Sequence, residues 1–164
     1  IEKTDYVLDI GCVQHNVEKS SHPSWLHKHL VEKAERVIGL DNQETEIDQL
    51  RQQGFDVISE NAEKFDLDQK FDVIVSGELI EHLPNPGMFL ESVLKHLKKD
   101  GRLILTTPNA WAFHRFKNAF KGDVPCNPEH VCWFDERTLK QLLERFEFSV
   151  SKCKYLKTSL PCKT

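Results

Sequence analysis

The sequence lacks any long apolar run, any long basic run and any pair of cysteines in a CxxC arrangement. A membrane-spanning helix needs about 20 consecutive apolar residues, so we expect no span, and no signal peptide is visible. The net charge is −4, which disfavours sequence-independent binding to nucleic acid phosphates. These absences favour a globular protein that acts neither on a bilayer nor on a nucleic acid.

Disulfide bonds are not expected either. The five cysteines form an odd set, at positions 12, 126, 132, 153 and 162, and such a set favours a reducing, cytoplasmic environment. A chain of 164 residues predicts one domain that can bury a core without cross-links.

Short β-branched runs recur along the chain and alternate with helical patterns. In the longest helical pattern, Asn85-Pro86 precedes apolar residues spaced as one helical stripe, up to Leu97. Asn42 and Asp135 are predicted to cap two further helices. The predicted strands cover residues 6–10, 36–40, 56–59, 71–76, 103–107 and, as a sixth strand, 148–155. This alternation predicts an α/β fold with a doubly wound, mostly parallel sheet and helices on both faces.

In such a sheet the ligand lies at the carboxyl ends of the strands. Gly11 follows the first predicted strand and lets the backbone approach a ligand closely. Asp41 follows the second strand, where a carboxylate can accept two ribose hydroxyls. Asn61 follows the third and offers a donor and an acceptor to an adenine edge. The pattern predicts a nucleoside site.

Segments 7–12, 37–41, 61–63, 71–83 and 97–109 resemble, in order, the motifs of class I S-adenosylmethionine (SAM) dependent methyltransferases. Segment 130–139 resembles one found in small-molecule, sugar and ubiquinone-type O-methyltransferases. The resemblance implies one SAM-binding domain over 1–164, in which the family's N-terminal helices and last strand are not evident. It implies cofactor binding by Asp9, Gly11, Cys12, Asp41, Asn42, Asn61, Ala62 and Gly77.

Two positions depart from the family pattern, because Val13 and His15 stand where glycines usually follow Gly11. A module that kept the fold but serves as a non-catalytic scaffold is therefore an alternative. A nicotinamide dehydrogenase is disfavoured, because its GxGxxG turn is missing two of three glycines.

Glu78, Glu81 and His82 are spaced so that one helical turn would place them on one face. With His130 they are the predicted catalytic residues, because an imidazole can take the proton of an acceptor hydroxyl near neutral pH. The same four side chains could instead hold a divalent metal ion. That option is not favoured, since the resemblance implies that Glu-x-x-Glu-His also occurs in metal-free relatives.

Residues 109–130 contain an aromatic and basic insertion that includes Trp111, Phe113 and Arg115. It is predicted to be either a lid over the acceptor or a helix that packs its aromatic residues on the sheet. Trp133 and Phe134 are expected in the core. The predicted function is O-methylation of a small molecule or glycan precursor by SAM, and a metal-dependent RNA 2′-O-methyltransferase is the remaining alternative.

Overall fold

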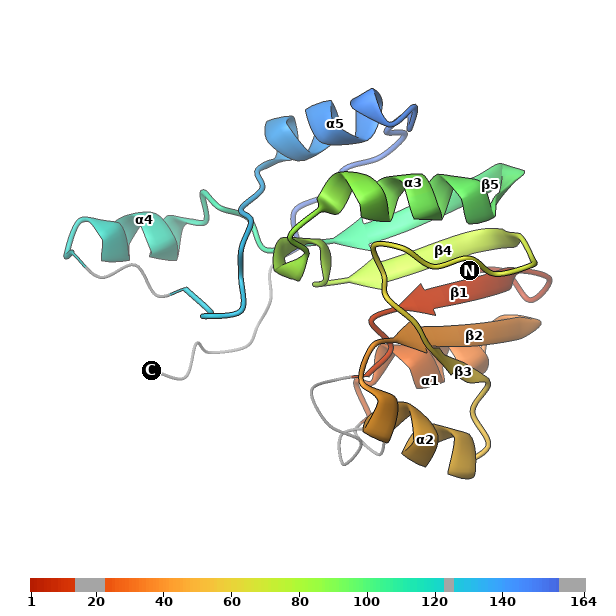
Figure 1. The fold of residues 1–164 in the computed structure, drawn as a ribbon. Coiled ribbons are helices and arrows are strands. Elements are labelled where there is room, and N and C mark those ends of the chain that lie inside the picture. Colours follow the sequence, from red (N-terminus) through yellow and green to blue (C-terminus); the bar gives the residue numbers. More distant parts are fainter. Residues whose placement is uncertain (14–22, 123–125, 157–164) are drawn as a thin grey trace.

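The computed structural model describes residues 1–13, 23–122 and 126–156, apart from the side chains of residues 114 and 116. Five parallel strands form one sheet in the order β3-β2-β1-β4-β5 (Figure 1). The order reverses beside β1, which creates the switch point where doubly wound sheets bind ligands. The strands are β1 (Tyr6–Ile10), β2 (Arg36–Asp41), β3 (Val57–Ser59), β4 (Phe71–Gly77) and β5 (Leu97–Thr106).

Helices cover both faces of the sheet (Figure 1). Side chains of α1 and α2 pack on one face, and those of α3 and α5 pack on the other. A short 3₁₀ turn, η2, follows β4, while α4 projects away from the sheet (Figure 1). The helices are α1 (Leu26–Val31), α2 (Glu44–Gln52), η2 (Ile80–His82), α3 (Pro86–His96), α4 (Phe113–Ala119) and α5 (Glu136–Arg145). The predicted fold class is confirmed.

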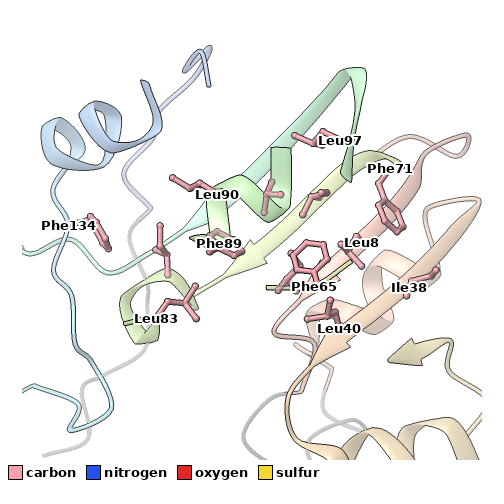
Figure 2. Packing of buried hydrophobic residues seen from close by; sticks show 14 residues of the cluster. Leu8, Ile38, Leu40, Phe65, Phe71, Leu83, Phe89, Leu90, Leu97 and Phe134 are labelled. Carbon is pink, nitrogen blue, oxygen red and sulfur yellow. The ribbon is translucent and has the colours of Figure 1, made fainter. Parts of the chain in front are cut away.

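The main core lies between the sheet and α3 (Figure 2). Leu8 and Leu40 extend from the sheet toward Phe89 and Leu90 of α3, and all four are fully buried. The neighbouring residue Val7 faces the opposite side and packs near Leu30 of α1. Because successive strand residues point to opposite faces, these strands are apolar on both sides, as a covered parallel sheet requires.

Helix ends match the sequence in part. Pro86 is the first residue of α3, as predicted, and Asp135 caps α5 by accepting a hydrogen bond of 2.7 Å from the Thr138 amide. Asn42 is not the cap of α2, because Gln43 occupies that position and no side chain caps the helix. Helix α2 therefore begins one residue later than the cap pattern predicts.

The predicted sixth strand over residues 148–155 is wrong, because these described residues form no strand. Phe148 instead packs, partly buried, against the core that α5 covers. Trp133 is also not a core residue, since it is 38% exposed, whereas Phe134 is buried as expected. Among the described helices, none has the length and apolar character needed to cross a bilayer.

Candidate active site

The carboxyl ends of the strands meet along one edge of the sheet. Ile10 of β1 pairs with Leu40 of β2 and with Ser76 of β4, and Gly77 pairs with Thr106 of β5. The residues that follow these positions must therefore lie side by side. The register brings Gly11, Asp41 and Gly77 to this edge.

Gly11 has a φ of +82°, which strongly favours glycine. Its amide donates to the Leu40 carbonyl at 2.8 Å, so the chain turns sharply where β1 ends. The backbone between Gly11 and Val13 then runs across the end of β2. This turn is the feature that the resemblance assigns to cofactor binding.

The Asp41 carboxylate is buried and already accepts hydrogen bonds from the protein. Its Oδ2 accepts from the Val13 amide at 3.0 Å, and its Oδ1 accepts from the Gln43 amide at 3.2 Å. Oδ1 also accepts from Nε2 of Gln43 at 3.4 Å, whereas Oδ2 can accept a second bond. Ribose hydroxyls would thus share these oxygens with Val13 and Gln43 or displace them.

Asp9 does not face the open edge of the sheet. Its Oδ2 lies 2.9 Å from Nδ1 of His27 on α1, and both side chains are almost fully buried. Nε2 of His27 is buried without a partner among the described residues. Sequence patterns gave no sign of this pair, because a histidine on an apolar helix face has no fixed partner in the chain.

The other predicted cofactor residues are spread along the same edge. Cys12 is buried, and burial raises the pKa of its thiol, so it is not a nucleophile. Asn61 is exposed, and its Oδ1 accepts from the Glu63 amide at 2.8 Å. Asn42 is exposed, Ala62 packs against the main core, and Gly77 ends β4. His15 lies outside the described residues.

Glu81 is the buried acid of the candidate catalytic cluster. It lies in η2 and is only 2% exposed. One carboxylate oxygen accepts from the Thr107 hydroxyl at 2.9 Å, while the other is buried with no partner among the described residues. Desolvation raises the pKa of this carboxyl group. An unpaired buried carboxylate oxygen is costly, so it points to a ligand or proton that binds there.

His82 and His130 lie beside this carboxyl group. Their rings meet edge to face, with centroids 4.6 Å apart. Each of Glu81, His82 and His130 offers one potential metal-ligand atom, a carboxylate oxygen or an imidazole nitrogen. These three atoms all lie within 4.8 Å of one another. The predicted convergence of His130 with Glu81 and His82, from which it is far apart in sequence, is therefore present.

The His130 backbone segment is held against Glu81. The amides of Val131 and Cys132 both donate to the Glu81 carbonyl, at 2.9 and 3.0 Å. Desolvation, followed by the charges of His82 and Arg115, lowers the pKa of His130. Its imidazole is therefore neutral at neutral pH and able to accept a proton, and its Nδ1 is buried with no partner among the described residues.

Glu78 departs from the predicted arrangement. The 3₁₀ turn covers only Ile80–His82, and Glu78 precedes it with a φ of +52°. It therefore does not share a helical face with Glu81 and His82, and its side chain is exposed. Local desolvation and the charge of Glu81 nevertheless raise its pKa, so it lies at the rim of the cluster.

Three residues near the cluster were not predicted to belong to it. Thr107 binds Glu81, Glu129 places Oε2 3.9 Å from Nδ1 of His82, and Trp133 contacts the His130 ring at 5.7 Å between centroids. Thr107 could have been found from its place just beyond β5. Glu129 and Trp133 could not, because a long loop brings them back to η2.

Three comparisons bear on this arrangement. A model of the methyltransferase domain family matches residues 1–152. A proposed S-adenosylmethionine-dependent methyltransferase of Mycolicibacterium smegmatis is 32% identical over 120 residues, which cover 71% of this chain and 45% of the relative. The ubiquinone biosynthesis O-methyltransferase of Pasteurella multocida is 29% identical over 125 residues, covering 65% of this chain and 49% of the relative.

The fold also resembles solved structures. A proposed methyltransferase of Bacillus halodurans C-125 superposes with a TM-score of 0.68 at 20% identity, covering 93% of this chain and 66% of that one. At that identity the likeness supports the fold alone. The chain spans about half the length of the curated relatives it matches. The family match covers nearly the whole sequence, and the chain belongs to the methyltransferase domain family.

Proposed function

We propose that this chain binds SAM at the carboxyl ends of its strands and transfers the methyl group to an oxygen of a small molecule or glycan precursor. The observation that carries the proposal is the buried, unpaired oxygen of Glu81 beside His82 and His130. The names of the Mycolicibacterium and Pasteurella relatives support SAM and an oxygen acceptor respectively.

The cofactor would lie across the Gly11 turn. Gly11 brings the backbone close to the ligand, Asp41 accepts ribose hydroxyls, and Asn61 with Ala62 borders the adenine. Asp9 would support the site without contacting the cofactor, because its pairing with His27 fixes the end of β1. In this proposal the sulfonium would lie near Gly77, which ends β4 just before the η2 turn that carries the catalytic cluster.

Methyl transfer is an in-line displacement, and the acceptor hydroxyl loses its proton near the transition state. His130 is the proposed base, since its lowered pKa keeps the imidazole neutral. Glu81, His82 and Thr107 hold the acceptor oxygen and the imidazole in place. Most of the remaining acceleration comes from aligning the oxygen with the methyl carbon.

A divalent metal ion is a second candidate at the same cluster. One carboxylate and two imidazoles form a set that binds many divalent metals, and Glu81 and His130 each keep a buried atom without a partner among the described residues. Glu81, His82 and His130 would hold the ion, with Glu78 at the rim. Such an ion would favour the ionised form of the acceptor hydroxyl. A metal-dependent RNA methyltransferase would use the same set, but the net charge of −4 disfavours RNA.

Calorimetry with S-adenosylhomocysteine tests the cofactor half of the proposal. We expect one site per chain, and a chain that does not bind would support the scaffold alternative. Titrating MnCl₂ into the same sample tests the metal. His29 is an exposed histidine of α1 and serves as the control. Mn²⁺ binding that is lost in His130→Ala but kept in His29→Ala would support an ion at the cluster. Transfer of labelled methyl from SAM to the phenol caffeate, but not to the amine histamine, would support an oxygen acceptor.

A further inference from the structure

Residues 61–67, which we call the β3–β4 segment, lie between the proposed adenine side of the site and helix α3. They follow β3 and precede β4 in the chain. Phe65 of this segment is only 3% exposed and belongs to the same core cluster as Leu83 and Phe89. The segment is therefore part of the packed core and not a free loop.

Polar side chains of α3 hold this segment along its length. Oγ of Ser92 donates to the Glu63 carbonyl at 3.0 Å. Nε2 of His96, which is buried, accepts from the Leu67 amide at 2.8 Å, while its Nδ1 lies 2.6 Å from the Ser92 carbonyl. The β3–β4 segment and α3 are therefore expected to move together.

Glu63 is bonded in both directions. Its amide donates to Oδ1 of Asn61 at 2.8 Å. Its carboxylate accepts from the Asn85 amide at 2.5 Å and from Nδ2 of Asn85 at 3.3 Å. Asn85 is the N-cap residue of α3 and does not cap the helix with its own side chain. One residue thus connects the proposed adenine contact, Asn61, to the start of α3.

The start of α3 lies close to the catalytic turn in the chain. Only Leu83 and Pro84 separate Asn85 from His82, the last residue of η2. Leu83 is buried, and its amide donates to the Ile80 carbonyl at 3.3 Å. Pro84 has a fixed φ. A connection this short and stiff transmits a displacement of Asn85 to His82.

We propose that Glu63 is a positioning residue that couples the two halves of the site. Adenine bound beside Asn61 fixes the β3–β4 segment, Glu63 then fixes the start of α3, and the η2 turn with Glu81 and His82 becomes more ordered. Ordering one segment lowers the entropic cost of ordering another that is bonded to it. The inference rests on the proposed function, because it assumes that adenine lies beside Asn61.

Hydrogen exchange of residues 79–85, followed by mass spectrometry on the full chain, tests the coupling. Adenosine is the probe, because it lacks the homocysteine part of S-adenosylhomocysteine, which would lie near η2. Saturating adenosine should slow exchange of the wild type about fivefold, as one additional hydrogen bond allows. Glu63→Gln keeps the amide that binds Asn61 but weakens the contact with Asn85. The slowing should therefore fall below about twofold, while adenosine affinity stays within about twofold of the wild type.

Two further variants separate coupling from helix stability. Asn85→Asp places a carboxylate opposite Glu63, yet aspartate remains a good helix cap, so the slowing should be lost without loss of the helix. Lys95→Gln breaks only the exposed pair of Lys95 with Asp66, at 2.7 Å, between the same segment and the same helix. This control should keep the full slowing.

The inference is overturned if adenosine binds the wild type without slowing exchange of residues 79–85, or if both Glu63→Gln and Asn85→Asp keep the slowing. It is also overturned if Lys95→Gln loses as much slowing as they do. If adenosine does not compete with S-adenosylhomocysteine for the wild type, the adenine side of the proposed function fails instead.

Discussion

The two halves of the candidate site differ in how well their carboxylates are satisfied. On the cofactor side, Asp41 accepts from Val13 and Gln43, and Asp9 pairs with His27. On the acceptor side, Glu81 and His130 each keep a buried polar atom that has no partner among the described residues. Nε2 of His27 and Oγ of Ser76 are also buried without a partner among the described residues, so the contrast concerns the carboxylates. Asp9 and Asp41 are paired by folding alone, whereas one oxygen of Glu81 is not.

This difference has an energetic meaning. A buried polar atom without a partner costs about 1–3 kcal/mol, and such a cost persists in a folded protein chiefly where function requires it. The cofactor side instead has to give up or share a hydrogen bond before ribose can enter. The acceptor cluster is therefore prepared for its ligand, whereas the Gly11 turn is closed by its own contacts.

The largest effect is expected at the acceptor side. His130→Ala should lower kcat about a hundredfold to ten-thousandfold, because general base catalysis contributes that much. Affinity for S-adenosylhomocysteine should not change, since His130 lies outside the proposed cofactor site. His29→Ala, which changes an exposed histidine of α1, should retain full activity.

Steady-state assays with SAM and caffeate measure both variants. A His130→Ala protein with more than half of the wild-type kcat would remove His130 from the mechanism. An equal loss in His29→Ala would show that the assay reports folding rather than chemistry.

The next effect concerns stability on the cofactor side. His27→Ala leaves the Asp9 carboxylate buried without its partner, which should cost roughly 3 kcal/mol of unfolding free energy. Arg36→Ala breaks the exposed pair with Asp56, at 2.9 Å, and should cost under about 1 kcal/mol. Urea denaturation compares the two variants. Equal losses of unfolding free energy would show that burial does not strengthen the pair of Asp9 and His27.

How well the sequence predicts a feature depends on how far apart along the chain the residues that form it lie. Strand ends such as Gly11 and Asp41 could be predicted, because β-branched runs and the residues that end them are local signals. The capping of α5 by Asp135 is equally local, since its partner Thr138 is three residues away. The parallel pairing of strands then places these ends at one edge without further information.

Contacts that form where a loop brings distant residues together could not be predicted in the same way. Glu78 falls outside the 3₁₀ turn because its φ is +52°, which no spacing argument reveals. The contact of Val13 with Asp41 and that of Glu129 with His82 join residues through loops. Even so, the prediction that His130 meets Glu81 and His82 is supported by their proximity.

A smaller effect is expected when the closed Gly11 turn is loosened. Val13→Gly removes a β-branched side chain that is 8% exposed and frees the backbone that donates to Asp41. Because one hydrogen bond is worth about 1 kcal/mol, S-adenosylhomocysteine should bind up to about fivefold more tightly. Val131→Gly, at an exposed valine near the acceptor cluster, should leave this affinity unchanged.

Calorimetry at constant ionic strength decides between these outcomes. Weaker binding by a folded Val13→Gly protein would mean that the Val13 contact supports cofactor binding rather than closing the site. A matching gain in Val131→Gly would point to general loosening of the chain.

The smallest effect is a pH-dependent difference in stability at Glu81. Its folded-state pKa is raised, chiefly by desolvation, so the folded chain holds this proton more tightly than the unfolded chain does. The stabilisation is fully present below the unfolded pKa of about 4.5 and is lost as pH rises through the folded value. The melting temperature of Glu81→Gln, measured relative to that of the wild type, should therefore rise from pH 4 to pH 7, because an amide does not ionise. Glu91→Gln, at an exposed acid of α3, should show no such gain. If the melting difference between Glu81→Gln and wild type is the same at both pH values, Glu81 is satisfied in the folded protein, and the contrast between the two halves of the site disappears.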